Sequence, residues 1–371
     1  MMGGILNARW PQRLMDLPWS IILLISGIGS FGLVILYSAA GGSVYPWAAN
    51  QGLKFGLFIA MMLVLSQVNI GFWLRVAYPL YTVLLLALIG VETLGQISGG
   101  SQRWLDLGVI RLQPSEFMKL AIVLALARFY HFLPRGYAGQ FAGIWPPLLM
   151  IGLPVALVML QPDLGTALMI VAGGLTIMFL GGLPLRWIVV PAVLLAASLP
   201  FVYNLLHDYQ QRRVLIFLDP AADPLGAGYH ITQSKIAIGS GGVSGKGFLQ
   251  GSQSHLEYLP EQQTDFVFAT MAEEWGLLGG AGLLLAFGIL LNWGMRVALQ
   301  THTVFGRLVA AGLSMTIFFY VLINVMMVMG LAPVVGIPLP LISYGGSAML
   351  TVMIALGILM SIHRQRRETS I

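Results

Sequence analysis

The stretch H-L-E-Y-L-P-E-Q-Q-T-D-F-V-F-A-T-M-A-E-E-W-G covers residues 255–276 and runs into an apolar segment. The run 275–295 is long enough to cross a bilayer by itself. Thr264 and Asp265 resemble a helix start, with a hydroxyl to cap and an acid in the first turn. We therefore expect a group of acids on a membrane boundary, in a chain where only 9% of residues are charged: Glu257, Glu261, Asp265, Glu273 and Glu274.

The composition indicates a membrane protein. The 371 residues are 57% hydrophobic, with a mean hydropathy of +0.84, whereas a soluble chain carries about 25% charged residues. The net charge of +5 does not indicate a nucleic-acid partner, because most basic residues punctuate apolar runs, as membrane topology demands. The chain has no cysteine, which excludes disulfides and thiolate chemistry.

About ten segments reach the ~20 apolar residues that a transmembrane helix needs. They predict an all-α polytopic membrane protein, organised as a single integral membrane domain over residues 1–371. One long extracytoplasmic loop, residues 207–264, lies between spans 7 and 8 and is too long to be an idle connection in a compact bundle. The predicted spans are 18–38, 53–70, 74–95, 115–133, 144–160, 164–181, 186–206, 275–296, 304–330 and 343–362.

Positive charge predicts the sidedness of these spans. With a cytoplasmic N-terminus, eleven arginines fall in cytoplasmic segments, against four cations in or beside the short outer loops. Both termini are then cytoplasmic. Of the fourteen acids, only Asp16 and Glu368 lie inside, so any chemistry faces outward. No ATP is available there, and a substrate would have to carry its own activated bond.

Two outer segments carry candidate site residues. Gln113-Pro114-Ser115-Glu116 opens the fourth span and Gln161-Pro162-Asp163 opens the sixth. In each, we expect proline in the first turn, where its missing N–H costs nothing, followed by an acid. Lys119 lies three residues after Glu116 on the same face. Capping and an ordinary ion pair are the alternative, but ionisable residues within a span are costly and usually functional. The candidates are Glu116, Lys119 and Asp163.

The remaining polar segments leave alternatives open. Outer cations suit an anionic headgroup such as a pyrophosphate, or an anionic lipid surface through the amphipathic segment 229–238. The glycine run 239–251 lacks the residues of a nucleotide-binding P-loop and predicts a flexible or tightly turning loop. The segment 338–347 either lines a cavity or simply breaks a helix. The candidate substrate-binding residues from these segments are Arg103, Arg111, Arg212, Arg213, Lys235, Lys246 and Ser343.

Asp265 is either a helix cap or a general base. A hydroxyl nucleophile loses its proton as it attacks, and a carboxylate at hydrogen-bond distance accepts it. A pyrophosphate leaving group needs only charge neutralisation. One carboxylate therefore suffices for inverting glycosyl transfer, unlike the carboxyl pair of a typical glycosidase. The sequence does not decide whether the pKa of Asp265 is raised or lowered. A helix N-terminus would lower this pKa, whereas nearby acids and apolar surroundings would raise it.

Several motifs together resemble the SEDS (shape, elongation, division and sporulation) family over nearly the whole chain. The stretches 207–214 (H-D-Y-Q-Q-R-R-V) and 256–261 (L-E-Y-L-P-E) resemble its elongation branch more than its division branch, which remains an alternative. The motifs are R-W-L-D-L-G at 103–108, Q-P-S-E-F-M-K at 113–119, Q-P-D-L-G-T at 161–166, L-D-P…D-P-L-G-A-G-Y-H-I-T-Q-S-K-I-A-I-G-S-G-G at 218–242, L-P-E-Q-Q-T-D-F-V-F-A at 259–269 and P-L-P-L-I-S-Y-G-G-S at 338–347.

The resemblance implies a glycosyltransferase that polymerises lipid II, an undecaprenyl-pyrophosphate disaccharide, on the outer face of the bacterial cytoplasmic (inner) membrane. It places the family's essential aspartate at Asp265. It also implies a divalent cation, Mg²⁺ or Mn²⁺, with unknown ligands. The implied partners are a class B penicillin-binding protein, which is a transpeptidase, and other membrane proteins of the elongation complex.

Two other functions remain open alternatives. A flippase or transporter of lipid-linked precursors would favour inverted repeats and charges near the bilayer midplane, whereas here the charges crowd one face. A non-enzymatic scaffold of wall synthesis is the other.

Overall fold

The computed structural model describes residues 16–94, 96–98, 101–106, 111–134, 136–203, 211, 215–217, 219, 226–255 and 261–368. Each of the ten predicted spans contains a helix, so the all-helical polytopic fold is confirmed. Seven of these helices are long and apolar enough to cross a membrane. Of the others, α5 carries three charged residues and α7 and α8 have 17 residues each. The ten are α2 (Trp19–Ala39), α3 (Trp47–Leu65), α4 (Ile70–Leu94), α5 (Pro114–Phe132), α6 (Phe141–Leu160), α7 (Leu164–Leu180), α8 (Arg186–Val202), α12 (Val267–Leu299), α13 (Val304–Val328) and α14 (Gly346–Glu368).

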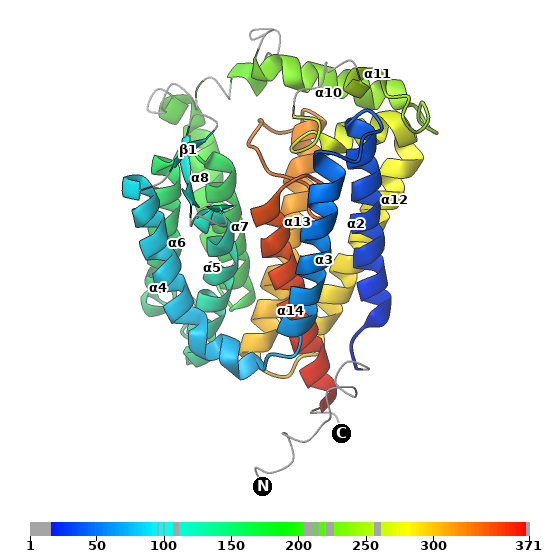
Figure 1. Ribbon diagram of the computed structural model, residues 1–371. Helices are drawn as coiled ribbons and strands as arrows, with labels where there is room; N and C mark the ends of the chain where they lie inside the picture. Colours follow the sequence, from blue (N-terminus) through cyan, green and yellow to red (C-terminus); the bar gives the residue numbers. More distant parts are fainter. Residues whose placement is uncertain are drawn as a thin grey trace.

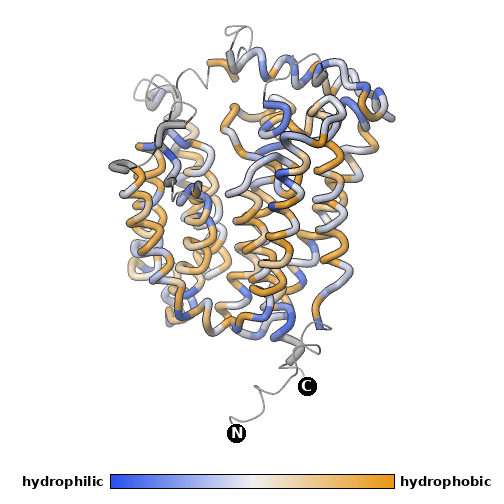
Figure 2. The backbone as a smooth tube through the Cα atoms, in the orientation of Figure 1, coloured by the Kyte–Doolittle hydropathy of each residue, from blue (hydrophilic) through white to orange (hydrophobic). Residues whose placement is uncertain are grey.

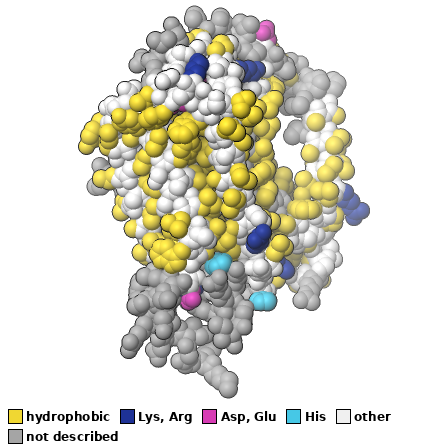
Figure 3. Space-filling model, turned by 90° about the vertical axis from the view of Figure 1, so that its right-hand side faces the viewer, with side chains coloured by type: hydrophobic (Ala, Val, Ile, Leu, Met, Phe, Trp, Pro, Cys, Tyr) yellow, Lys and Arg dark blue, Asp and Glu magenta, His cyan; other side chains and the backbone are white. Residues whose placement is uncertain are grey.

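The ten helices stand side by side, and two further helices lie across one end of the bundle (Figure 1). These are α10 (Ala227–Gly241), which contains the predicted amphipathic segment, and α11 (Ser252–His255). Figure 2 shows hydrophobic residues along the upright helices and hydrophilic ones mostly at their ends and in α10. In Figure 3, hydrophobic side chains cover most of the described surface between the two ends. This distribution is what a lipid environment requires.

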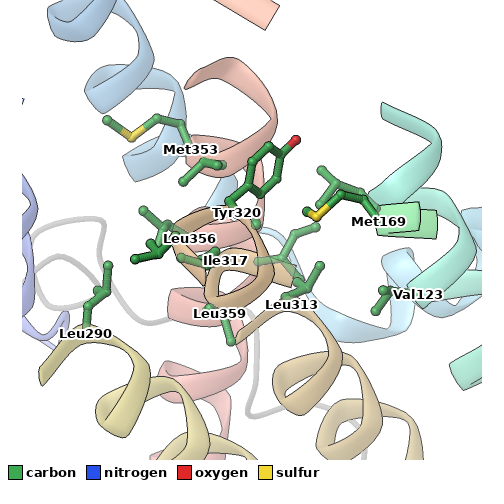
Figure 4. Packing of buried hydrophobic residues seen from close by; sticks show 14 of the residues in the cluster. Val123, Met169, Leu290, Leu313, Ile317, Tyr320, Met353, Leu356 and Leu359 are labelled. Atoms are coloured by element: carbon green, nitrogen blue, oxygen red, sulfur yellow. The ribbon is translucent and has the colours of Figure 1, made fainter. Parts of the chain in front are cut away.

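Helix α5 lies at the centre of the packing. It contacts α4, α6, α7, α13 and α14, and its side chains are buried along most of its length. Figure 4 shows part of this core, where Val123 of α5 and Met169 of α7 face Leu313 and Ile317 of α13. Side chains in the first turns of α5, after Pro114, are therefore surrounded by protein.

The connection between α4 and α5 contains a small antiparallel sheet, an addition to the all-α expectation. It consists of β1 (Gln96–Ser98), β2 (Ser101–Asp106) and β3 (Arg111–Leu112), in the order β1-β2-β3. Ile97 pairs with Gln102, and Asp106 pairs with Arg111. The sheet carries Arg103 towards the start of α7.

Helix α12 begins at Val267, and the expectation that Thr264 and Asp265 open it is wrong. Its N-cap is Phe266, which has no side-chain cap bond. The Thr264 hydroxyl instead donates 2.8 Å to Glu261 Oε2. A break at Gly276 (φ 64°, ψ −161°) divides α12 into a short first helix and the span that follows. Asp265 therefore lies in a turn (residues 261–266) before the helix, and it is not a cap.

The glycine run packs tightly against the break in α12. Leu277 N donates 2.9 Å to Gly242 O, and Lys246 N donates 3.0 Å to Glu273 O. A Cβ added to Gly276 would lie 2.3 Å from Gly245 N, closer than any side chain allows. Of the two predicted forms of this run, the structure has the tightly turning one.

Replacing Gly276 with alanine is expected to destabilise the protein by more than about 3 kcal/mol, because the new methyl group overlaps backbone and the positive φ disfavours alanine. Gly282→Ala is the matched control, since a Cβ at Gly282 in the same helix meets nothing within 4 Å. Thermal unfolding of the two purified variants measures the difference. Equal melting temperatures would contradict the close packing.

Candidate functional site

Three consecutive backbone carbonyls hold the turn that carries Asp265. Gln263 O accepts from Tyr344 N at 2.7 Å, and Thr264 O accepts from the Ser343 hydroxyl at 2.6 Å. Asp265 O accepts from Asn324 Nδ2 at 2.9 Å. All three donors come from α13 or the segment between α13 and α14. The backbone of residues 263–265 is therefore fixed by groups more than fifty positions away in the sequence.

The segment between α13 and α14 is itself braced. Asn324, which is fully buried, also donates 2.7 Å to Ile337 O. Ser343 Oγ accepts from Leu339 N at 2.8 Å, and Gln51 of α3 donates 2.9 Å to Ser343 O. The predicted helix break is thus confirmed, and its backbone is buried in protein. Ser343, a predicted substrate-binding residue, is 3% exposed and uses its hydroxyl for these internal bonds.

The Asp265 carboxylate lies among groups that disfavour its charge. Burial, then Glu261 and then Asp163 raise its pKa from 3.8 to about 6. Its Oδ2 lies 3.4 Å from where a Cβ on Gly336 would stand, and Gly336 has a φ of +68° that suits glycine. A carboxylate with a pKa near neutrality is suited to accept a proton.

Asp163 is the N-cap of α7, with Oδ1 accepting from Thr166 N at 3.0 Å. Pro162 precedes the cap, so the expectation that it occupies the first turn of this helix is wrong; the same expectation is confirmed for Pro114 of α5. Arg103 donates to the carbonyls of Gln161 (3.0 Å) and Pro162 (2.6 Å). Its Nη1 lies 4.0 Å from Asp163 Oδ2. Asp163 and Arg103, both predicted site residues, are thus brought together.

The predicted pair of Glu116 and Lys119 is present and is joined by a third residue. Lys119 Nζ donates 2.5 Å to Glu116 Oε1 and 2.8 Å to the Tyr320 hydroxyl, which donates to Glu116 Oε2. All three residues are at most 5% exposed. In Figure 4 the Tyr320 hydroxyl points away from Ile317 and Leu313, at the edge of the apolar core. The ion pair is therefore closed on itself in this structure.

The other cations predicted to bind substrate fall into different settings. Lys246 pairs with the buried Glu273 at 2.6 Å. Lys235 is exposed on α10, with its Cε against Gly330. Arg111 is paired with Asp106 in the sheet, and the structure describes its backbone only. Arg212 and Arg213 lie outside the described residues. The predicted cations therefore do not form one cluster within the part of the chain that the structure describes.

Sequence reasoning missed Tyr320, Asn324 and Gln51. Each is a polar residue inside an apolar run, and this pattern could have identified all three from the sequence. Tyr320 and Asn324 are one helical turn apart on α13, so they lie on the same face. From that face, α13 contacts both the ion pair of α5 and the Asp265 turn.

Within the described residues, no three His, Cys, Asp or Glu side chains form a ready-made metal site. Asp163 nevertheless lies near enough to Asp265 to raise its pKa. Mg²⁺ in proteins is commonly held by one or two carboxylates together with ligand phosphates. The residues present therefore fit a cation that arrives with a phosphate-bearing ligand, with Asp163 as its protein ligand.

Comparison with known proteins gives a consistent result. The model of a family described as "Cell cycle protein" (FtsW, RodA and SpoVE) matches residues 18–368. The chain is 44% identical over 352 residues to the peptidoglycan glycosyltransferase MrdB of Escherichia coli K12, covering 95% of this chain and 94% of MrdB. It is 31% identical over 431 residues to the peptidoglycan glycosyltransferase RodA of Treponema pallidum, covering 95% of this chain and 98% of RodA.

Two solved structures also resemble this chain. One chain from a peptidoglycan synthase complex that coordinates polymerisation and crosslinking matches with a TM-score of 0.82 and 34% identity, covering 94% of this chain and 98% of that one. The crystal structure of RodA from Thermus thermophilus matches with a TM-score of 0.71 and 30% identity, covering 94% of this chain and 97% of that one.

Replacing Asn324 with alanine is expected to lower the free energy of unfolding by about 1–3 kcal/mol, because it leaves the buried carbonyls of Asp265 and Ile337 without a donor. Ser314→Ala is the matched control: Ser314 is a buried polar residue of the same helix whose hydroxyl bonds only to Ala310 O. Thermal unfolding, extended to Ser343→Ala and the double variant, tests whether the two residues hold one turn. A double variant whose loss equals the sum of the single losses would contradict this.

Proposed function

Because the chain belongs to the SEDS family and is a peptidoglycan glycosyltransferase of the RodA/MrdB type, we propose that it polymerises lipid II with Asp265 as the general base. The observation that supports this role is a half-buried carboxylate with a raised pKa, held on a turn that distant segments fix in place. Two other carboxylates that the structure describes are in different settings. Glu273 is ion-paired with Lys246, and Asp163 caps a helix.

The reaction needs one proton acceptor and one charged leaving group. The 4-hydroxyl oxygen of the acceptor GlcNAc forms a bond to C1 of the donor MurNAc, and its proton passes to Asp265. The C1–oxygen bond to the pyrophosphate breaks, and undecaprenyl pyrophosphate leaves with the electron pair. Because attack and departure are on opposite faces of C1, the configuration inverts and a second carboxyl group is not needed.

A divalent cation, Mg²⁺ or Mn²⁺, is part of the proposal. Asp163 would hold it together with the pyrophosphate oxygens, and it would supply charge neutralisation to the leaving group. Arg103 would keep Asp163 and the start of α7 in place through its contacts with the 161–163 backbone. Because this cation would arrive with the substrate, the raised pKa of Asp265 describes the free enzyme.

The site is proposed to face outward from the bacterial cytoplasmic membrane, with both termini in the cytoplasm. The charge distribution of the sequence supports this orientation. The structural match to a chain of a peptidoglycan synthase complex supports a partner, for which we propose a class B penicillin-binding protein of the elongation complex.

Asp265→Asn is expected to lower polymerisation of purified lipid II by about 10²–10⁴-fold, because an amide cannot accept the proton. The assay uses the full chain with its transpeptidase partner, in Mg²⁺ and in chelator, and the wild type is expected to require the cation. As the matched control, Asp16→Asn changes an exposed aspartate far from the site and keeps wild-type activity. Equal glycan synthesis by wild type and Asp265→Asn would exclude the assignment. An inactive wild type would favour transport or scaffolding.

In the same assay, the wild-type rate is expected to fall as the pH drops below about 6. The pKa of Asp265 is raised, so the carboxylate gains its proton, and loses its ability to act as a base, at a higher pH than an ordinary aspartate would. The pH profile of kcat/KM reports this ionisation in the free enzyme. A rate that stays level down to pH 5 would contradict the role of Asp265.

A cysteine introduced at the exposed Glu261 is expected to react with a membrane-impermeant thiol reagent in intact spheroplasts. The chain contains no other cysteine, so labelling reports this position alone. A cysteine at His302, in the turn before α13, is the matched control and is expected to react only after the membrane is opened. The reverse pattern would place the site in the cytoplasm and remove its substrate.

A further inference from the structure

Lys54 is a partly buried cation near the start of α3. It lies seven positions after the start of α3 at Trp47, which is about 10 Å along the helix axis. Its Nζ lies 4.8 Å over the centre of the Tyr344 ring. The same atom is 3.9 Å from where a Cβ on Gly346 would stand. The ammonium group therefore faces the segment that joins α13 to α14.

No acid neutralises Lys54 within the described part of the chain. The three ion pairs found there involve Arg103, Lys119 and Lys246, whereas Lys54 lies over the Tyr344 ring. An ionisable residue inside a transmembrane helix costs free energy and normally has a partner. Among the described residues, the positive charge of Lys54 is therefore left without a carboxylate partner.

The position of Lys54 relates it directly to Asp265. Tyr344, which carries the ring beneath Lys54, donates its backbone N–H to Gln263 O at 2.7 Å. Gln51, one turn before Lys54 on α3, donates 2.9 Å to Ser343 O. The same short segment therefore contacts Lys54 on one side and the Asp265 turn on the other.

We propose that Lys54 binds a phosphate group of the lipid-linked pyrophosphate and positions the leaving group opposite Asp265. The inference rests on the proposed function and adds a residue to it. A lysine ammonium is a common phosphate ligand that acts as a point charge. Negative charge develops on the pyrophosphate as its bond to the sugar breaks, so a fixed cation stabilises the transition state more than the ground state.

The phosphate of a bulk lipid headgroup has the same chemistry as a substrate phosphate. The two sources differ in what they carry, because only the substrate class has an isoprenoid chain on a pyrophosphate. Binding of farnesyl pyrophosphate in discs of zwitterionic lipid isolates the substrate class. Repeating the measurement in discs with anionic phosphatidylglycerol tests the headgroup.

The test uses the full chain carrying Asp265→Asn, so that binding is measured without turnover. Lys54→Gln is expected to weaken farnesyl pyrophosphate binding on the order of 10- to 100-fold, while farnesol binding stays unchanged. Lys54→Arg keeps the charge and is expected to retain most of the affinity. Arg307→Gln is the matched control, because it removes an exposed cation near the start of α13, at the opposite end of the bundle.

Equal affinity of the Lys54→Gln and parent proteins for farnesyl pyrophosphate would overturn the proposal. So would an equal loss of affinity for farnesol, which would indicate a structural role. A loss of affinity seen only in anionic discs would assign Lys54 to bulk lipid and also overturn it. The failure of Asp265 as a base would appear separately, as activity retained by Asp265→Asn in the polymerisation assay.

Discussion

Backbone that leaves a helix beside lipid must find its hydrogen bonds inside the protein, and this constraint organises the site. The turn at 261–266 and the segment between α13 and α14 are both non-helical. Hydrogen bonds from that segment and from α13 satisfy the backbone carbonyls of the turn. An unpaired carbonyl in such a setting would cost several kcal/mol. The two segments are therefore held together firmly, and the Asp265 carboxylate is carried into surroundings that raise its pKa. The chemistry of the site follows from this pairing of backbone.

The charges around the site fall into two classes. Arg103, Lys119 and Lys246 are satisfied by groups of the chain itself, and they fix α7, α5 and the glycine run in place. Within the described part of the chain, Asp265 and Lys54 have no such ion pair, and both lie next to the segment between α13 and α14. A substrate that brings a hydroxyl proton and a pyrophosphate supplies what each of them lacks. The internally paired charges provide the rigidity that such positioning needs.

The sequence predicted the features that depend on local pattern. Apolar runs located ten helices, and the spacing of Glu116 and Lys119 located an ion pair. The sequence did not predict contacts that depend on packing between distant segments. Tyr320 joins that ion pair because α13 packs against α5. Asn324 of the same helix bonds to the Asp265 carbonyl, also across a long separation in sequence. Thr264 looked like a cap, but its hydroxyl bonds to Glu261 and the helix begins at Val267. The tight form of the glycine run required knowledge of the break at Gly276.

The pairing of Glu116 with Lys119 has a consequence for how the protein enters the membrane. Helix α5 is inserted long before α13 is synthesised, so Tyr320 is absent when the translocon releases it. Unpaired charges in the first two turns of a span raise the free energy of its insertion. Because the partners are three residues apart in one helix, they neutralise each other during passage into the bilayer. Biogenesis of α5 therefore does not have to wait for the C-terminal half of the chain.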